Sequence, residues 1–366
     1  MTIENRLSHF YNKITFLLPQ LRNINVKNLN SLPAQIDTMI IGRNKISELA
    51  NGSIQEVTEE DLNGITTIGY YAFSNCRSLT NIIIPDSVVS IGRGALTSTG
   101  YDNDENNWEN GLLYIDNCLV YIKRNYSSYE IKPGTRLMAD EIFQNCNKLV
   151  SIVIPGSIAN VSVYAFSGCN NLTDVIMRSG VTSIGNRAFN GCTSLTSIII
   201  PDSVTSIGDH VFGNCTSLTS IEIPDSVTSI GDHVFRGCTN LESITFGDGI
   251  TSIGMYTLEG CSKLTSVTIG DNVTKIGNAA FSGCTSLTSI TIPDSVTSIS
   301  VYAFRGCTNL TNIYLNPTNP PILNSPYDTI PSTTTIHVPV GSGDAYKSAT
   351  NWSRHSERIV EDIVLS

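Results

Sequence analysis

Apolar residues recur along this chain every 23 residues, and the polar residues between them recur with the same period. The unit reads I-x-I-P-D-S-V-T-S-I-G-x-x-A-F-x-G-C-T-S-L-T-S, which Ile198 to Ser220 follows except at Val211 and Asn214. One cysteine marks the same place in successive units: Cys146, Cys169, Cys192, Cys215, Cys238, Cys261, Cys284 and Cys307. A fixed period without insertions or deletions indicates an array of stacked structural repeats.

Each unit encodes one short strand followed by a turn. Ile198 and Ile200 alternate with Ile199, which predicts a strand that points Ile198 and Ile200 inward and Ile199 outward. Pro201 lacks the N–H that a further ladder bond needs, so the strand should end there in a turn. Stacking of the strands should produce one parallel sheet through Ile198, Ile221, Ile244, Val267 and Ile290.

The second half of the unit, from Ile207 to Cys215, is too short and too rich in glycine for a full helix, which needs about 10 residues or more. Extended backbone or one turn of 3₁₀ helix is expected there. Strands stack about 4.8 Å apart and helices about 8–10 Å apart, and this mismatch is what curves a solenoid. Repeats without helices should therefore stack into a nearly straight solenoid.

These patterns predict a repeat solenoid that is mainly β, a right-handed leucine-rich-repeat coil with a parallel β-sheet, little helix in the repeats and low curvature. We expect the solenoid over residues 64–315, an N-terminal cap over 1–63 and an irregular C-terminal cap over 316–366. The N-terminal cap should contain an amphipathic helix whose apolar face holds Ile3, Leu7, Phe10 and Ile14. Degenerate repeats should follow it, with apolar positions at Ile54, Val57, Leu62, Ile65 and Ile68. The C-terminal cap should contain a last strand at 335–339 and a short helix at 342–352.

An insert at about 97–123 interrupts the array, because the interval from Cys76 to Cys146 exceeds three units by one residue and its interior is rebuilt. Its first part, 97–109, is predicted to be a polar, acidic loop around Trp108. Its second part, 112–122, should form a hairpin that turns at Asp116-Asn117. The acidic residues lack the ordered spacing of a calcium loop, which favours a solvated loop over a calcium site. Cys118 lies outside the cysteine register and is the candidate reactive thiol.

The formal net charge of -10 and the pI near 4.9 argue against a nucleic-acid partner, because phosphate binding needs clustered Lys and Arg. Without a run of about 18 apolar residues, membrane insertion is not expected. The first 21 residues lack the basic region, apolar stretch and cleavage site of an export signal, so none is expected there.

Catalytic signatures such as G-x-S-x-G, H-E-x-x-H or G-x-x-x-x-G-K are absent from the sequence, so we expect neither an enzyme nor a bound cofactor. The cysteine ladder could indicate disulfides or a metal site. Stacked identical positions point their side chains in parallel, however, which does not favour S–S geometry. Reduced, buried thiols are the favoured interpretation.

Asp209-His210 and Asp232-His233 repeat in adjacent units, so the two imidazoles should lie about 5 Å apart. A zinc or nickel site is one reading, and a solvent-exposed spacer is another. A third reading is a binding stripe, because other units hold tyrosine or arginine at this position, residue types that contact surfaces favour. The hydroxyl-rich strand face should serve mainly to keep the sheet soluble. The partner contacts expected on this basis are Trp108, Tyr164, Arg187, His210, His233 and Tyr256.

The rhythm I-P-x-S-V-T-S-I-G-x-x-A-F-x-G-C-x-S-L, from Gly64 to Leu315, resembles the BspA-like class of leucine-rich repeats found on bacterial surface antigens and some protist surface proteins. The insert segment 112–118 and the tail 338–347 are similar to recurrent elements of that family. The resemblance implies adhesion to host matrix proteins, coaggregation or stimulation of innate receptors. It also implies a location at the cell surface or outside the cell. The opening segment 54–62 looks like caps of related proteins encoded in phages and prophages.

Two functions follow as hypotheses. The first is a non-catalytic recognition or adhesion module that binds a protein or glycan ligand through an extended repeat surface. The alternative is a structural spacer or receptor-binding component of a phage-like particle, attached through the N-terminal helix. An enzyme that uses the histidine pair is a third class, retained only for testing.

Overall fold

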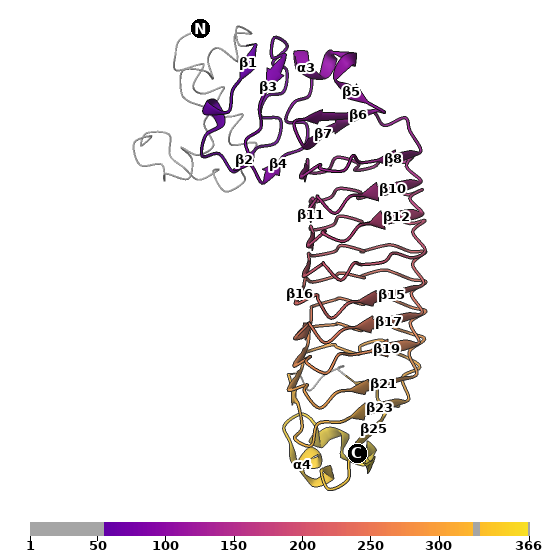
Figure 1. Ribbon diagram of the computed structural model, residues 1–366. Helices are drawn as coiled ribbons and strands as arrows, with labels where there is room; N and C mark the ends of the chain where they lie inside the picture. Colours follow the sequence, from indigo (N-terminus) through magenta and orange to yellow (C-terminus); the bar gives the residue numbers. More distant parts are fainter. Residues whose placement is uncertain (1–54, 325–329, 365–366) are drawn as a thin grey trace, which may run out of the picture. The chain divides into compact units, whose positions relative to one another are not determined.

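The computed structural model describes residues 55–324 and 330–364, which belong to two compact units, Met1–Asn107 and Trp108–Ser366 (Figure 1). Each unit is described by itself. The expected amphipathic helix through Ile3, Leu7, Phe10 and Ile14 lies outside the described residues, as does Ile54. The expected domain boundaries at 63/64 and 315/316 remain predictions, and the two compact units meet inside the insert.

The described part of the smaller unit contains two parallel strand pairs and three short helical segments. Strand β1 (Glu56–Val57) pairs with β3 (Asn81–Ile82), and β2 (Thr67–Ile68) pairs with β4 (Ser90–Ile91). The 3₁₀ helix η4 (Glu60–Leu62) lies between β1 and β2. The degenerate repeat pattern holds, since its described apolar residues Val57, Leu62, Ile65 and Ile68 are all buried.

The first part of the insert is not the loop that we expected. It forms α3 (Gly100–Asn103) and η5 (Glu105–Asn107) in the smaller unit and β5 (Trp108–Glu109) in the larger one. The Thr99 hydroxyl caps α3 by accepting a bond from the Asp102 N–H at 3.1 Å. Composition alone indicated a polar segment and gave no sign of this capping interaction.

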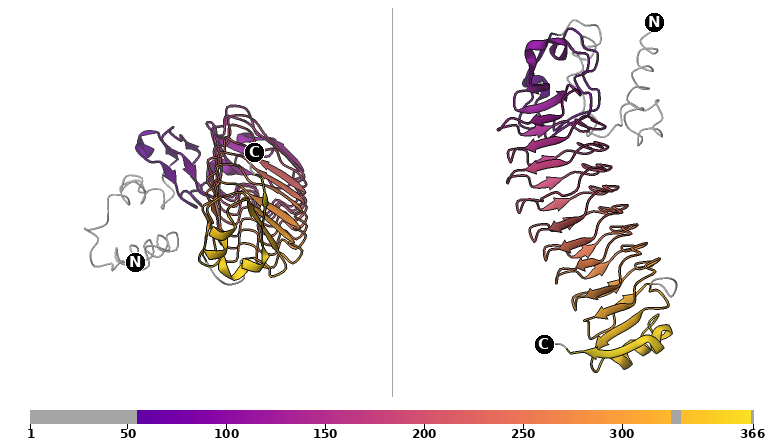
Figure 2. Two further views of the ribbon diagram at one scale, coloured as in Figure 1. Left: turned by 90° about the horizontal axis from the view of Figure 1, so that it is seen from below. Right: turned by 90° about the vertical axis from the view of Figure 1, so that its right-hand side faces the viewer.

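The larger unit is a parallel β-solenoid with little helix, and its coils carry one strand on each of two sides (Figures 1 and 2). The longer strands form the front side: β8 (Ser128–Glu130), β10 (Ser151–Ile154), β12 (Asp174–Met177), β15 (Ser220–Ile223), β17 (Ser243–Phe246), β19 (Ser266–Thr268), β21 (Ser289–Ile292), β23 (Asn312–Leu315), β25 (Thr335–Pro339) and β26 (Ile359–Ile363). Two-residue strands form the other side: β9 (Leu137–Met138), β11 (Asn160–Val161), β13 (Ser183–Ile184), β14 (Ser206–Ile207), β16 (Ser229–Ile230), β18 (Ser252–Ile253), β20 (Lys275–Ile276), β22 (Ser298–Ile299) and β24 (Ile322–Leu323).

The front strands follow the predicted register but not the predicted continuity. Ile221 pairs with Ile244, and Ile244 pairs with Val267, each one repeat further along. Ile198 belongs to a coil that has a strand only on the second side, β14, and the front strands divide into three sheets, β8-β10-β12, β15-β17-β19 and β21-β23-β25-β26. The expectation of one sheet through all five positions is therefore wrong, although the coils stack in the expected order.

Both sides of the coil are extended backbone, so neighbouring coils are spaced alike on the two sides and the axis of the larger unit shows little curvature (Figure 2). Glycine permits this close approach. A Cβ on Gly231 would lie 2.7 Å from the Asp209 nitrogen of the preceding coil, closer than real Cβ contacts allow. The expectation for Ile207–Cys215 was extended backbone or a 3₁₀ turn: the extended strand ends at Ile207, and turns closed by bonds such as Cys215 N–H to the Phe212 carbonyl follow it.

The core is a set of ladders in which each buried side chain packs on its equivalent in the next coil. The rings of Phe166 and Phe189 stack with centroids 5.2 Å apart, and those of Phe212 and Phe235 with centroids 5.5 Å apart. All four side chains are fully buried. Leu258 replaces phenylalanine in the following coil and is buried in the same slot.

Both ends of the larger unit break the repeat. The predicted hairpin is confirmed, because β6 (Leu112–Ile115) pairs antiparallel with β7 (Cys118–Ile122) around Asp116-Asn117. At the other end, α4 (Gly343–Ser348) confirms the predicted helix, and η6 (Ser353–Arg358) follows it. The strand at 335–339 is present but is not the last, because β26 pairs parallel with it.

Two aromatic side chains fix this C-terminal end. The Trp352 indole N–H donates to the Pro321 carbonyl at 2.6 Å, and the Tyr346 hydroxyl donates to the Pro317 carbonyl at 2.7 Å. Both side chains are fully buried. Throughout the described ranges, no helix is long and apolar enough to cross a membrane.

Because Phe212 packs between Phe189 and Phe235, Phe212→Ala should open a cavity between three coils. We expect the free energy of unfolding to fall by about 3–5 kcal/mol, measured by guanidinium denaturation followed by circular dichroism. Thr219→Ala, at an exposed position of the following segment, is the matched control and should change it by less than about 0.5 kcal/mol. Equal effects of the two substitutions would contradict the ladder interpretation.

Candidate functional site

The variable position that lies two residues before the buried Phe, or before Leu258 in its place, adopts left-handed backbone geometry. The φ angles are 54° at Tyr164, 57° at Arg187, 53° at His210, 58° at His233 and 55° at Tyr256. We call these five residues the variable row. For L residues this geometry costs roughly 1–2 kcal/mol each, so something in the fold must compensate for it.

Hydrogen bonds between coils provide this compensation. The Tyr164 N–H donates to the Asn186 carbonyl at 2.9 Å, and the His210 N–H donates to the Asp232 carbonyl at 2.9 Å. The other members of the variable row make the same bond to the following coil. The left-handed turn thus directs the amide along the solenoid axis and leaves the side chain partly exposed.

The side chains of the variable row stack on one another. The imidazoles of His210 and His233 lie parallel with centroids 4.3 Å apart, which confirms the predicted spacing. The Tyr256 ring continues the stack 4.8 Å from His233. At the other end, the Arg187 guanidinium lies over the Tyr164 ring at 5.5 Å and donates to the Tyr164 hydroxyl at 2.8 Å. The row therefore contains a stack of three rings, His210, His233 and Tyr256, and a cation–π pair, Arg187 and Tyr164.

The surroundings of His210 favour its neutral imidazole. Burial, then His233 and Arg187, lower the pKa of His210 below its usual range. His233 Nδ1 is buried without a hydrogen-bond partner. Face-to-face rings do not converge their nitrogens on one point, and within the described ranges no group of three or more His, Cys, Asp or Glu side chains could hold a metal ion.

The aspartates beside the histidines have a structural role. The Asp209 carboxylate accepts the Asp232 N–H at 2.9 Å, and the Asp232 carboxylate accepts the Met255 N–H at 2.7 Å. Each carboxylate thus connects its coil to the next one. The repeated Asp-His pair therefore combines a connector between coils with a member of the variable row.

Trp108 lies in β5 and belongs to the insert, not to the variable row. Its ring packs edge-on against Tyr121 at 6.0 Å, and the Lys123 ammonium lies 4.9 Å from its centroid. β5 pairs antiparallel with β6 of the hairpin. The structure therefore gives Trp108 a strand position with packed neighbours, where we had expected a loop.

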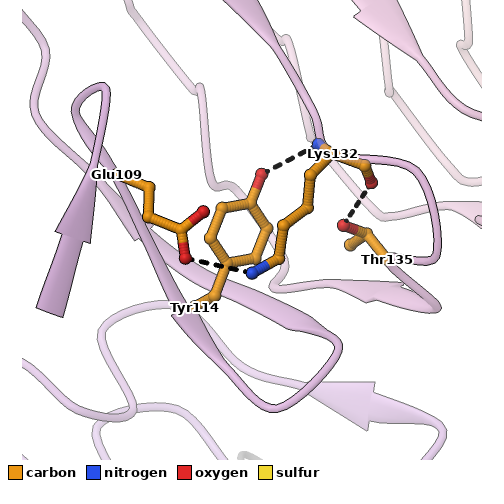
Figure 3. Close-up of polar contacts among 4 residues, drawn as sticks. All are labelled: Glu109, Tyr114, Lys132 and Thr135. Carbon is orange, nitrogen blue, oxygen red and sulfur yellow. Dashed lines mark hydrogen bonds and ion pairs between the residues drawn. The ribbon is translucent and has the colours of Figure 1, made fainter.

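Lys132 fastens this insert to the coil that follows it (Figure 3). Its ammonium lies 3.1 Å from the Glu109 carboxylate and 4.2 Å from the centroid of the Tyr114 ring. The Lys132 N–H donates to the Tyr114 hydroxyl at 3.2 Å, and the Thr135 hydroxyl donates to the Lys132 carbonyl at 2.8 Å. These bonds hold β5, and with it Trp108, in a defined position.

Two acidic residues of the insert, Asp102 and Asp104, make local bonds. The Asp102 carboxylate accepts the Ser98 N–H at 2.8 Å, and Asp104 accepts the Asn106 N–H at 3.0 Å. Burial raises the pKa of Asp102 above its usual value. These contacts stabilise the helical turns of residues 100–107.

None of the ten cysteines forms a disulfide, which agrees with the predicted thiol ladder. The ladder cysteines from Cys146 to Cys307 are fully buried, and from Cys169 onward each thiol donates to a backbone carbonyl of the preceding coil at 3.0–3.4 Å. Burial raises the pKa of Cys169, Cys215 and Cys261 to about 12. Cys118 is also fully buried, so its expected role as an accessible, reactive thiol is wrong.

We had expected a hydroxyl-rich strand face, but the face is not uniformly hydroxyl-rich. Val153, Ile176 and Ile199 occupy its outward position in consecutive coils, and Ile176 and Ile199 are 48% and 82% exposed. The same position holds Glu222 and then Thr245, Thr268 and Thr291 in later coils. The sequence contained this signal, because Ile199 was already expected to point outward, but the repeat consensus concealed the run of three.

Comparison with known proteins identifies the repeat type. A family model described as the BspA type leucine rich repeat region (6 copies) matches residues 47–173, 113–242, 160–287 and 205–330. No curated protein matches the chain.

Among solved structures, a leucine-rich repeat protein from Bacteroides ovatus is 26% identical, covers 85% of this chain and 84% of its own, and has a TM-score of 0.54. The T. pallidum leucine rich repeat protein is 27% identical over 50% of this chain and 90% of its own, with a TM-score of 0.45.

The buried thiols should be inert in the native protein. At pH 8, iodoacetamide should leave Cys118 and the ladder cysteines unmodified, while half-buried Cys76 reacts. All ten should react in guanidinium, and mass spectrometry of peptides counts them. Rapid native modification of several ladder cysteines would overturn the assignment.

Folding raises the pKa of these thiols, so their contribution to stability is complete below the pKa of an exposed thiol, roughly 8.5, and is lost as the pH rises toward about 12. We expect the free energy of unfolding to fall between about pH 9 and 12. Cys215→Ala should make this fall shallower, by at most about 1.4 kcal/mol per pH unit. An unchanged slope in urea denaturation would contradict the prediction.

Proposed function

Since the chain belongs to the BspA type leucine-rich repeat family, whose repeats generally serve as protein-interaction modules, we propose that it is a non-catalytic recognition or adhesion module. It binds a protein or glycoconjugate through its extended repeat surface. The contacts are the variable row, Tyr164, Arg187, His210, His233 and Tyr256, together with Trp108 of the insert. Its place of action is the cell surface or the space outside the cell, as the family resemblance implies.

The observation that carries this proposal is the stacked variable row. Coils that are near copies of one another offer near-identical contacts, so specific recognition needs positions where successive coils differ. The variable row supplies such differences at one fixed site per coil. Tyr and Arg are among the residue types that dominate binding energy in protein interfaces.

Preorganisation supports the same proposal. The bonds between coils fix the backbone, and stacking against neighbours restricts each side chain before a ligand arrives. Immobilising a free side chain on binding costs about 0.5–1.5 kcal/mol, and a stacked side chain avoids part of that cost. Trp108, packed by Tyr121 and Lys123, has the same advantage.

The test measures affinity for whichever ligand the full chain captures from immobilised host matrix proteins and a glycan array. Arg187→Ala combined with Tyr256→Ala should weaken binding by about 2 kcal/mol or more, and Trp108→Ala by a similar amount. Alanine suits the backbone of the row, because Ala279 occupies the same position with a φ of 51°.

The matched control is Thr268→Ala with Thr291→Ala, on the exposed strand face of later coils, which should leave the affinity unchanged. If this control pair abolished binding while the row and Trp108 variants bound normally, the assignment of the contacts would be wrong.

A further inference from the structure

The outward row of the front sheet contains an aliphatic run that the fold does not require. Val153 pairs with Ile176 in adjacent strands, and Ile199 follows one repeat later with 82% exposure. Val150, which directly precedes β10, is 41% exposed. The position accepts threonine in three other coils, so its aliphatic residues contribute little to the packing of the coil. A contiguous exposed apolar patch of this kind marks an interaction surface more often than a single exposed residue does.

Carboxylates surround this aliphatic run. Glu130 precedes Val153 in the register of the sheet, and Glu222 follows Ile199 one repeat later. Asp174 lies in the same strand as Ile176, and all three acidic residues are exposed. The outward residues within β8, β10, β12 and β15 include no Lys or Arg, and the exposed cation nearest to these strands in the sequence is Arg178, which directly follows β12. An apolar centre with a charged rim is the anatomy of a protein interface, here with an acidic rim.

We propose that this patch, Val153, Ile176 and Ile199 with its rim of Glu130, Asp174 and Glu222, binds a protein segment whose apolar side chains are flanked by Lys or Arg. The rim attracts the basic flanks, and the aliphatic run buries the apolar centre. A second copy of this chain would bring its own acidic rim against this one, at a net charge of -10 per copy, so it does not fit. Aliphatic side chains also give a sugar neither a flat ring nor a hydrogen bond.

This surface differs in position and chemistry from the variable row, and its test uses different residues. The probe is a synthetic peptide with a Leu-Trp-Leu core and two lysines on each side. Two control peptides are compared with it. One has the same core flanked by glutamates, and the other has a Ser-Gly-Ser core flanked by lysines. Binding to the full chain is followed by fluorescence anisotropy and by calorimetry.

The decisive variant replaces Val153, Ile176 and Ile199 with threonine, the residue that three later coils carry at this position. It should keep the thermal unfolding of the unchanged chain and bind the lysine-flanked Leu-Trp-Leu peptide at least roughly tenfold more weakly. Glu130→Gln with Glu222→Gln should weaken binding and reduce its dependence on salt. Two double variants should leave binding of the peptide unchanged. The first is the matched control on later coils, Thr245→Ser with Thr268→Ser, and the second is Arg187→Ala with Tyr256→Ala.

Three results would overturn the proposal. The first is that the threonine variant binds the peptide as tightly as the unchanged chain, which would show that charge alone accounts for the binding. The glutamate-flanked or Ser-Gly-Ser peptide could bind as well as the lysine-flanked Leu-Trp-Leu peptide. In sedimentation, the unchanged chain could form a dimer that the threonine variant lacks, which would make a second copy the occupant.

Discussion

The contact between one coil and the next is the interaction on which the larger unit depends. A single coil encloses no core of its own, so its buried side chains are covered only by those of its neighbours. Parallel strands hold neighbouring coils in register, and each side chain therefore meets its own equivalent, as Phe212 meets Phe235 and His210 meets His233. Buried polar groups obey the same rule, since the Cys215 thiol donates to the Phe189 carbonyl of the preceding coil.

This register also shapes the surface. A substitution at one position of one unit becomes part of a row along the solenoid, so neighbouring substitutions combine into an extended feature. The variable row and the aliphatic run on the strand face both arise in this way. They differ in chemistry, because one presents stacked rings and a guanidinium while the other presents aliphatic groups within an acidic rim. The same register thus produces two chemically distinct surfaces on one scaffold.

The sequence predicted features that a local pattern determines. Alternation predicted the strand at Ile221–Ile223, the turn at Asp116-Asn117 predicted the hairpin, and the invariant spacing predicted the buried thiols. Two-residue strands such as Ser206–Ile207 are too short to show alternation. β26 pairs with β25 only after an intervening helix, so its partner could not be read from spacing. The patch at Ile199 was missed because a consensus averages over the very residues that depart from it.

The left-handed backbone of the variable row illustrates why the rest of the site was not predictable. Propensity places glycine or asparagine at such φ values, yet this row holds tyrosine, arginine and histidine. The hydrogen bond from the backbone N–H to the following coil fixes the backbone there whatever the side chain is. Ala279 makes the same bond and has a φ of 51°. The scaffold therefore bears the conformational cost and accepts residues of different size and chemistry at this position. A position with a fixed backbone and a variable residue type lets a stacked repeat change its contacts without changing its fold.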